Sequence, residues 1–337
     1  MVLQQKINKH SMEISFTICS ANFLPYAKSL GDSLKEHNCK HNFFIFLLDR
    51  YPNIDGSFFS PHQIITVTDI GLVNFSEMEE KYTIFELSCA MKPFIADYIF
   101  KREKECDKLF YFDSDILIFN QLSEAEKALE DCSILLTPHL ISTKEFDGKI
   151  EIEKNILRTG IYNAGFFGLK KSKETNDFLE WWKYKMENYC FNDLDNGFFV
   201  DQLWLNLAVT IFTGVKLILN EGYNVAYWNL DEREITLRNG KYFVNETCPL
   251  VFYHFSGFDL DAENLLSKHF SQQSFEKWPV CLSLFNIYKT KALSNNRDFF
   301  SLIPQVGKKI EIPVIGIIRE KNFFKRKYKK WFSNKRD

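Results

Sequence analysis

The chain has 337 residues, of which 45% are hydrophobic and 26% are charged, as is usual for a folded globular protein. With 14 glycines and 9 prolines, the composition excludes a collagen-like chain and a chain that is disordered throughout. The net charge of −2 is unevenly spread: residues 319–337 carry nine basic and two acidic side chains, which leaves −9 for the rest. This acidic body argues against nucleic acid as a partner, because nucleic-acid-binding domains carry basic charge on their folded face.

The cysteines and the apolar segments indicate in which cellular compartment the protein is expected. None of the eight cysteines forms a C-x-x-C pair, so a structural zinc site built on cysteine is not expected. Residues 1–11 are polar and lack the apolar stretch of a secretory signal peptide. No run approaches the roughly 18 apolar residues of a membrane span. We therefore expect a cytoplasmic protein with free thiols.

The first 120 residues predict alternating strands and helices. In chain order we expect a strand at 14–19, a helix at 26–37, strands at 42–48 and 63–67, a helix at 85–102 that Pro93 kinks or restarts, and a strand at 108–112. The second strand is apolar almost throughout, as is typical of a strand buried on both faces of a parallel sheet. This alternation predicts an α/β protein with an open, mainly parallel sheet, whose ligands bind at the carboxyl ends of the strands.

The second half of the chain continues the pattern less regularly. Strands are expected at 134–137, 166–169 and 251–254, and helices at 175–188, 200–212 and 276–293. We divide the chain into an α/β domain over residues 1–270, a helical C-terminal extension over 271–318 and a basic, aromatic tail over 319–337. Residues 308–318 are expected to form a linker or an edge strand.

An Asp-x-Asp pair marks the most informative turn. Such pairs occur at Asp113/Asp115, Asp193/Asp195 and Asp259/Asp261. Only the first lies between two apolar segments, directly after the predicted strand 108–112. Two carboxylates one residue apart can share a divalent cation through hard oxygen ligands; the alternative is a solvated turn. His254 ends a strand and is a reasonable third ligand, although a lone histidine is more often structural.

Two polar segments accompany this turn. In one, Asn163 can hydrogen-bond a hydroxyl and Gly165 lets a ligand approach the backbone, although a plain turn is the alternative. In the other, Asp201 and Gln202 open an apolar helix. A carboxylate there either interacts with the helix dipole or, with its neighbouring amide, faces a polar ligand.

Six motifs in order resemble a known family. They are Ser20–Asn22, Lys92-Pro93, Phe112–Asp115, Tyr162–Gly165, Val200–Gln202 and Tyr253–Gly257. Over residues 14–258 the chain resembles the nucleotide-sugar glycosyltransferases with a single Rossmann-like domain of the GT-A type, close to glycosyltransferase family 8. Residues 222–229 are also similar to a segment of bacterial surface-polysaccharide glycosyltransferases. The resemblance implies a GT-A type mixed sheet flanked by helices.

The resemblance also implies roles for single residues. Mn²⁺ or Mg²⁺ would be bound by Asp113, Asp115 and His254. The catalytic residues around the donor sugar would be Asn163, Asp201 and Gln202. The nucleotide sugar would be bound by Ser20, Ala21, Asn22, Lys92, Asp113, Ser114, Asp115, Ala164, Gly165 and Gly257, and the acceptor by Trp228 and Asn229.

The chain departs from the family at two places. Ser20 stands where the family usually has an acid, and Phe258-Asp259-Leu260 follows Gly257 where the family commonly has Lys-Pro-Trp. A lysine that would contact the donor phosphates is therefore missing at that place.

The resemblance implies transfer of a sugar, with retention of configuration, from a nucleotide sugar to a glycan or lipid-linked glycan. UDP is the expected nucleotide because the family mostly uses it. Competing interpretations are a catalytically inactive glycan- or nucleotide-binding protein on the same fold, and a nucleotidyltransferase. The latter needs a glycine-rich phosphate loop, and residues 17–26 contain no glycine. The tail 319–337 interleaves basic and aromatic residues and is expected either to rest on an anionic membrane surface or to be solvated.

Overall fold

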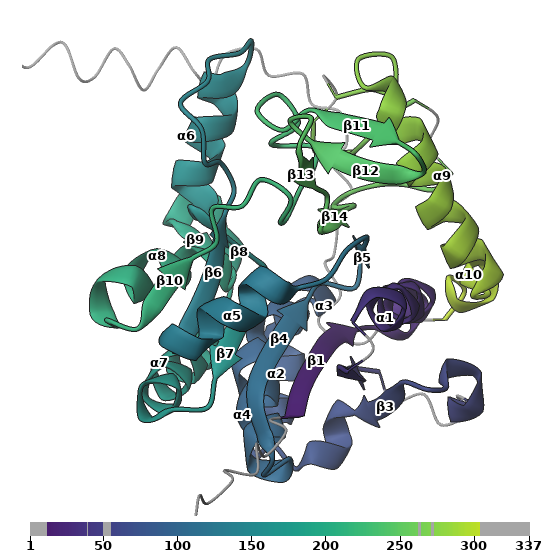
Figure 1. Ribbon diagram of the computed structural model, residues 1–337. Coiled ribbons are helices and arrows are strands. Elements are labelled where there is room, and N and C mark those ends of the chain that lie inside the picture. The colour runs from purple at the N-terminus through teal and green to yellow at the C-terminus, as the bar shows by residue number, and fades with distance from the viewer. Residues whose placement is uncertain (1–11, 39, 50–54, 262–263, 271–272, 304–337) are drawn as a thin grey trace, which may run out of the picture.

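The computed structural model describes residues 12–38, 40–49, 55–261, 264–270 and 273–303 (Figure 1). Its centre is a seven-stranded sheet with the order β10-β6-β7-β4-β1-β2-β3. The strands are β1 (Met12–Cys19), β2 (Asn42–Leu47), β3 (Gln63–Thr66), β4 (Cys106–Phe112), β6 (Ile134–Pro138), β7 (Tyr162–Lys170) and β10 (Val215–Leu217). The predicted strands are thus confirmed, with shifts at their ends.

The sheet is mixed, as predicted. Strands β1, β2, β3 and β4 are parallel to one another, and β10 is parallel to β6, whereas β7 runs antiparallel to both of its neighbours β4 and β6. From Glu13 to Cys19 and from Phe43 to Leu47 every residue is buried, which explains why β2 is apolar almost throughout, whereas β1 also buries Ser15 and Thr17. The carboxyl ends of β1 and β4 therefore meet at one edge of the sheet.

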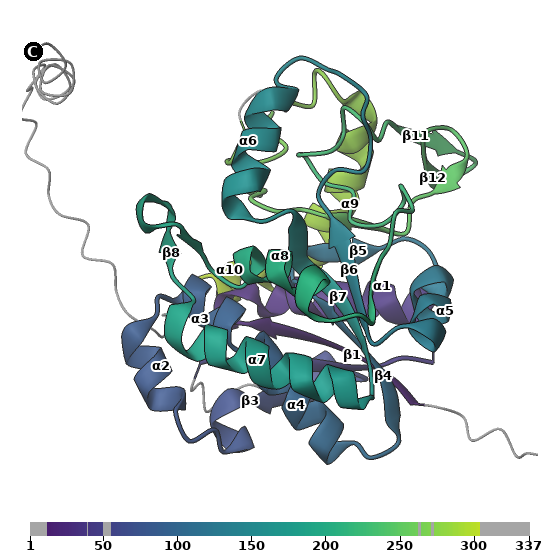
Figure 2. The ribbon, with the colours of Figure 1, turned by 90° about the vertical axis from the view of Figure 1, so that its left-hand side faces the viewer.

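Helices cover both faces of the sheet (Figure 2). They are α1 (Leu24–His37), α2 (Phe75–Lys81), α3 (Ile84–Ala90), α4 (Lys92–Arg102), α5 (Ser123–Asp131), α6 (Lys149–Thr159), α7 (Lys173–Tyr189), α8 (Gln202–Ile211), α9 (Pro279–Ser294) and α10 (Arg297–Phe300). One face packs against α1 and α5, and the other against α3, α4, α7 and α8. Phenylalanine fills both cores: the ring of Phe167 packs against Phe16, Tyr111 and the fully buried Trp182.

The segment at 85–102, where Pro93 was predicted to kink or restart the helix, consists of two helices, so the restart is confirmed. Helix α3 begins with a capping box in which the Thr83 side chain accepts from the Glu86 backbone and the Glu86 side chain accepts from the Thr83 backbone. A new helix, α4, begins at Lys92 with Pro93 in its first turn, where proline needs no backbone N–H donor. The restart places the side chain of Lys92 at a helix start facing the sheet edge.

Smaller elements gather at the carboxyl-terminal edge of the sheet (Figures 1 and 2). A two-stranded ladder pairs β5 (Ile116–Ile118) with β14 (Phe252–His254), and a three-stranded sheet contains β11 (Ile235–Arg238), β12 (Lys241–Val244) and β13 (Cys248–Pro249). A further hairpin joins β8 (Asn192–Asp193) to β9 (Phe198–Phe199). Helix α9 shares a core with β12 and β14 and stacks the ring of Tyr288 on Tyr26 of α1.

The C-terminal helix predicted at 276–293 is confirmed as α9. The boundary predicted at residue 270 stays a prediction. Residues 308–318 and the basic tail 319–337 lie outside the described residues. Among the described helices, none combines the length and apolar character needed to cross a membrane. The seven cysteines of the described part are free thiols.

Candidate functional site

The Asp-x-Asp turn joins β4 to β5 at the carboxyl-terminal edge of the sheet. Strand β5 pairs antiparallel with β14, and in this register His254 lies opposite Ile116. The Phe255 N–H donates to the Asp115 carbonyl over 2.8 Å. The ladder therefore brings together Asp115 and His254, which are far apart in the sequence.

Three predicted ligand side chains converge here. Their ligand atoms all lie within 4.8 Å of one another: His254 Nε2 is 3.1 Å from Asp115 Oδ1 and 3.8 Å from Asp113 Oδ2. On the other side of the ring, His254 Nδ1 is 3.3 Å from Asn224 Oδ1. Because an amide oxygen only accepts, Nδ1 carries a proton and Nε2 faces the two carboxylates.

His254 and Asp115 each shift the pKa of the other. Burial alone would lower the pKa of His254, but the charges of Asp115 and Asp113 outweigh it and raise that pKa. Burial would likewise raise the pKa of Asp115, yet the adjacent His254 holds it below its usual value. Without a metal, these two shifts favour an imidazolium–carboxylate pair at this position. A divalent cation would have to replace the proton on Nε2.

The surroundings fit such an ion. Two carboxylates and one imidazole are a donor set that Mn²⁺ accepts, and hard carboxylate oxygens also suit Mg²⁺. Gly165 on β7 leaves the space that the side chains of His254 and Asp113 need: a Cβ there would lie 2.5 Å from His254 Cε1 and 2.8 Å from Asp113 Oδ2. Gly165 thus serves the close approach of the ligand side chains.

A buried lysine sits behind the turn. Lys92 Nζ is 2.8 Å from Asp201 Oδ2 and 3.4 Å from Asp113 Oδ1, and it donates to the Ala164 carbonyl over 3.0 Å. Burial opposes the charged form, but Asp113 and Asp201 together raise the pKa of Lys92. Burial raises the pKa of Asp201, and the ammonium group counteracts this. The hydroxyl of Tyr111 donates to Asp113 Oδ1 over 2.6 Å.

Asn163 and Gln202 form a second polar chain. Asn163 Nδ2 is 3.3 Å from Gln202 Oε1 and 3.2 Å from His139 Nε2, and Gln202 Nε2 donates to the Thr159 carbonyl. His139 Nδ1 lies 3.0 Å from the Ile161 carbonyl, so Nδ1 carries the proton and Nε2 accepts. Burial lowers the pKa of His139 to about 4. The neutral ring therefore orients the Asn163 amide.

The predicted nucleotide loop lies one strand away. Ser20 and Ala21 are buried at the end of β1, and the Ser20 hydroxyl donates to the side chain of Asn22. The Ala21 N–H donates to the carboxylate of Asp49, which is buried just after β2. Because β1 and β4 are parallel neighbours, this loop and the Asp113 turn share one edge of the sheet.

Trp228 and Asn229, which were predicted to contact the acceptor, lie next to the ligand residues. The Trp228 ring meets the His254 ring edge-on with centroids 5.3 Å apart. Asn229 is fully buried, and its amide group bonds to the backbone of Asn224, Ala226 and His139. Contact of Trp228 and Asn229 with an acceptor stays a prediction. Here the Asn229 amide fixes the turn that carries Asn224, and Trp228 packs against the ligand His254.

Gly257 and Ser114 complete the set of predicted residues. Gly257 has a φ of +70°, and a Cβ there would lie 2.3 Å from the ring of His269, so this position requires glycine for both reasons. Ser114 is buried between the two aspartates.

Four residues that shape the site were not predicted from the sequence: Tyr111, His139, Asn224 and Asp49. His139 and Asp49 were detectable in principle, because each follows a strand whose carboxyl end lies at this edge. Tyr111 lies within a buried strand, and Asn224 precedes the predicted strand by many residues. Tyr111 carries no signal in the sequence, whereas Asn224 lies within residues 222–229, the segment noted for its similarity to surface-polysaccharide glycosyltransferases.

No protein-family model matches the chain. It is 28% identical over 250 residues to the uncharacterized protein YfnF of Bacillus subtilis (strain 168). The aligned region covers 74% of this chain and 82% of YfnF. YfnD of the same organism is 24% identical over 257 residues, covering 73% of this chain and 78% of YfnD.

The solved structures that match include glycosyltransferases. The galactosyltransferase LgtC in complex with donor and acceptor sugar analogs is 15% identical with a TM-score of 0.43, over 72% of this chain and 86% of LgtC. The apo form of the glycosyltransferase GlyE of Streptococcus pneumoniae TIGR4 is 16% identical with a TM-score of 0.47, over 85% of this chain and 64% of GlyE. Likenesses of this size fix no activity, so the function has to be inferred from the side chains.

Proposed function

We propose that the protein is a metal-dependent glycosyltransferase that moves a sugar from a nucleotide-sugar donor to a glycan or lipid-linked glycan. The convergence of Asp113, Asp115 and His254 at the carboxyl-terminal edge of the sheet carries this proposal. Ligands of open α/β sheets bind at this edge. The order of motifs that resembles nucleotide-sugar glycosyltransferases supports it independently.

The three ligand side chains would hold Mn²⁺ or Mg²⁺. When bound, such an ion stabilises the negative charge that develops on a leaving diphosphate. Lys92 acts on this centre through its ion pairs, because its ammonium group is bound to Asp201 and Asp113 and is 2% exposed. We therefore propose that Lys92 positions the carboxylates, whereas sequence analysis expected it to face the donor.

The polar chain beside the ligands is proposed to face the donor sugar. Asn163 lies two residues from Gly165, and Gln202 and His139 fix the orientation of its amide. Gln202 and Asp201 stand behind it at the start of α8. The nucleotide is proposed to bind along the loop Ser20–Asn22, with a UDP-sugar as the expected donor. An acceptor that attacks from the face of the departing diphosphate would give retention of configuration.

An acceptor in bacterial surface-polysaccharide synthesis fits the residues 222–229 that resemble such enzymes. We propose a cytoplasmic site of action. Contact of residues 319–337 with an anionic membrane remains a proposal from the sequence, since those residues lie outside the described part of the chain.

The test is nucleotide release from a panel of nucleotide sugars in the presence of Mn²⁺. We expect metal-dependent release from one donor by the wild type, and its loss in the double variant Asp113→Asn/Asp115→Asn. The matched control is Asp193→Asn/Asp195→Asn, which alters an Asp-x-Asp pair in the turn between β8 and β9. This control should keep the activity of the wild type.

Nucleotide binding in the same samples separates the two functional classes. Metal-dependent binding without release, even with glycan acceptors added, would favour the inactive nucleotide-binding protein. Absence of both binding and release would refute the proposal and leave a glycan-binding protein. If release occurs, the anomeric proton signals of the first product in NMR decide between retention and inversion.

A further inference from the structure

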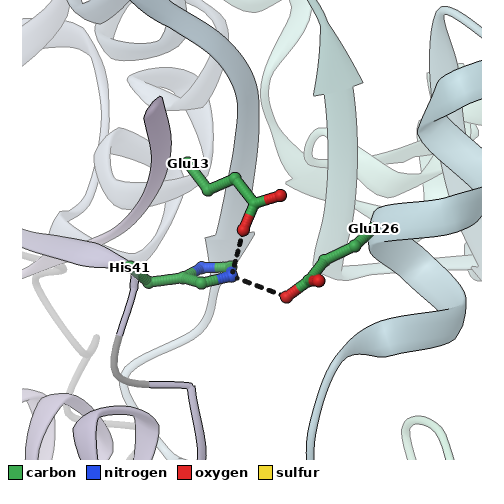
Figure 3. Close-up of side chains that lie close together, drawn as sticks. All are labelled: Glu13, His41 and Glu126. Atoms are coloured by element: carbon green, nitrogen blue, oxygen red, sulfur yellow. Dashed lines mark hydrogen bonds and ion pairs between the residues drawn. The ribbon is translucent and has the colours of Figure 1, made fainter. Parts of the chain in front are cut away.

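A second group of ligand-type side chains lies at the opposite end of the sheet. Glu13 lies at the start of β1, His41 directly before β2, and Glu126 in α5 (Figure 3). Their side chains point toward one another, and one ligand atom of each lies within 4.8 Å of the others. Because β1 runs from Glu13 toward the proposed active-site edge, this group is separate from the Asp113 site.

The histidine cannot satisfy both carboxylates with its single proton on Nε2. His41 Nε2 is 3.1 Å from Glu126 Oε1 and 3.3 Å from Glu13 Oε2. The N–H hydrogen bond goes to Glu126, and Glu13 Oε2 has no hydrogen-bond partner among the described residues. Glu13 is only 8% exposed, so its Oε2 relies on the ion pair with His41 over 3.3 Å and has no hydrogen bond of its own, which leaves this buried oxygen incompletely compensated.

The ring is already oriented as a ligand. His41 Nδ1 lies 2.8 Å from the hydroxyl of Ser15, which can accept the Nδ1 proton and leave the Nε2 lone pair free for a metal. Zinc ligands at about 2.0–2.1 Å in tetrahedral geometry stand about 3.3 Å apart. The two distances from His41 to the glutamates match this separation closely.

The charge around the group leaves room for a cation. Lys108 Nζ donates to the Glu126 backbone carbonyl over 2.7 Å and lies 3.8 Å from Glu13 Oε1. It thus faces the oxygen of Glu13 that points away from His41. Lys40, whose side chain is 72% exposed, is 3.6 Å from Glu126 Oε2. The lysines thus contact Glu13 Oε1 and Glu126 Oε2, whereas His41 Nε2 contacts the other oxygen of each carboxylate.

We propose that Glu13, His41 and Glu126 form a second metal site that binds a borderline divalent cation such as Zn²⁺. One such ion coordinates the imidazole and both carboxylates at once, whereas the proton of Nε2 serves only one of them. The ion would tie the start of β1, the segment before β2 and helix α5 together. Its role is structural, since the site lies away from the proposed active site.

The test measures zinc stoichiometry in metal-stripped protein by equilibrium dialysis and elemental analysis. The background is Asp113→Asn/Asp115→Asn, which weakens the first site. We expect one tightly bound zinc per chain in this background and none after adding His41→Gln or Glu126→Gln. The matched control is His62→Gln, because His62 is also buried but contacts a single carboxylate, Asp32, over 2.9 Å; it should keep its zinc.

Two results would overturn the proposal. One is that the background variant binds no zinc, which would mean that a protonated His41 alone holds the two glutamates. The other is that zinc persists unchanged after His41→Gln, which would place it on surface side chains. Circular dichroism establishes that each variant is folded. If the background variant is not, the same comparison is made in the wild type, where His41→Gln should lower the stoichiometry by one.

Discussion

Replacing Gly165 by alanine should damage the proposed metal site more than the fold. The added Cβ would lie 2.5 Å from His254 Cε1, 2.7 Å from Asn163 Oδ1 and 2.8 Å from Asp113 Oδ2. Ordinary contacts need about 3.5 Å or more, so these side chains must retreat by about 1 Å. Metal–ligand distances tolerate only about 0.2 Å. We therefore expect Mn²⁺ affinity to fall by at least about 10- to 100-fold, the loss seen when ligands are misplaced from outside the coordination shell.

The assay is Mn²⁺ binding, measured by titration calorimetry, together with the free energy of unfolding. Overpacking alone should lower that free energy by about 1–3 kcal/mol. The control is Gly168→Ala on the same strand, where a Cβ would lie 3.2–3.3 Å from Leu129, Phe110 and Leu135, all away from the metal ligands. This variant should lose some stability and keep its Mn²⁺ affinity. Equal Mn²⁺ affinity in Gly165→Ala and the wild type would refute the assigned site geometry.

Three further predictions follow from the charges. Lys92→Met leaves Asp113 and Asp201 without their buried counter-charge, so urea unfolding should show a loss of about 3 kcal/mol or more; an unchanged midpoint would contradict the ion pairs. Mn²⁺ affinity should fall as the pH drops through the raised pKa of His254, by up to about tenfold per pH unit, because the metal must displace a proton. Titration calorimetry at several pH values measures this dependence, and a Mn²⁺ affinity that does not change with pH would contradict it. The folded-state pKa of His41 is raised above that of the unfolded chain because Glu126 and Glu13 outweigh burial. The stability that this shift contributes is therefore complete below about pH 6.5 and is lost as the pH rises through the raised pKa. In the presence of a chelator, the stability difference between the wild type and His41→Gln should be constant below about pH 6.5 and should shrink as the pH rises through the raised pKa of His41.

The sequence was sufficient to predict those parts of the fold that follow from local periodicity. The buried strands β1, β2 and β4 and the helix α1 are apolar or amphipathic over their own lengths. The direction of β7 was not predictable, because an apolar strand pairs equally well in either direction. Likewise, nothing local indicates that Ile116–Ile118 pairs with Phe252–His254, a contact that spans more than a hundred residues.

The candidate site shows the same limit. Asp113 and Asp115 were identifiable because they follow a buried strand, and His254 because it ends one. Glu13, His41 and Glu126 lie in three unrelated segments with no characteristic spacing. Only the fold shows that their side chains meet.

The two groups of one histidine and two carboxylates differ in what balances their charge. At the Asp113 edge a third carboxylate, Asp201, is buried with them, and Lys92 is the buried lysine that faces them. The carboxylates therefore outnumber this ammonium group by two, which a divalent cation compensates better than the single proton on His254. At the Glu13 end Lys108 already offsets one carboxylate, so a proton on His41 balances the other. We therefore expect a divalent cation to bind with higher affinity at the Asp113 edge. At the Glu13 end, zinc competes with a proton on His41, and its binding is favoured mainly because one ion coordinates both carboxylates.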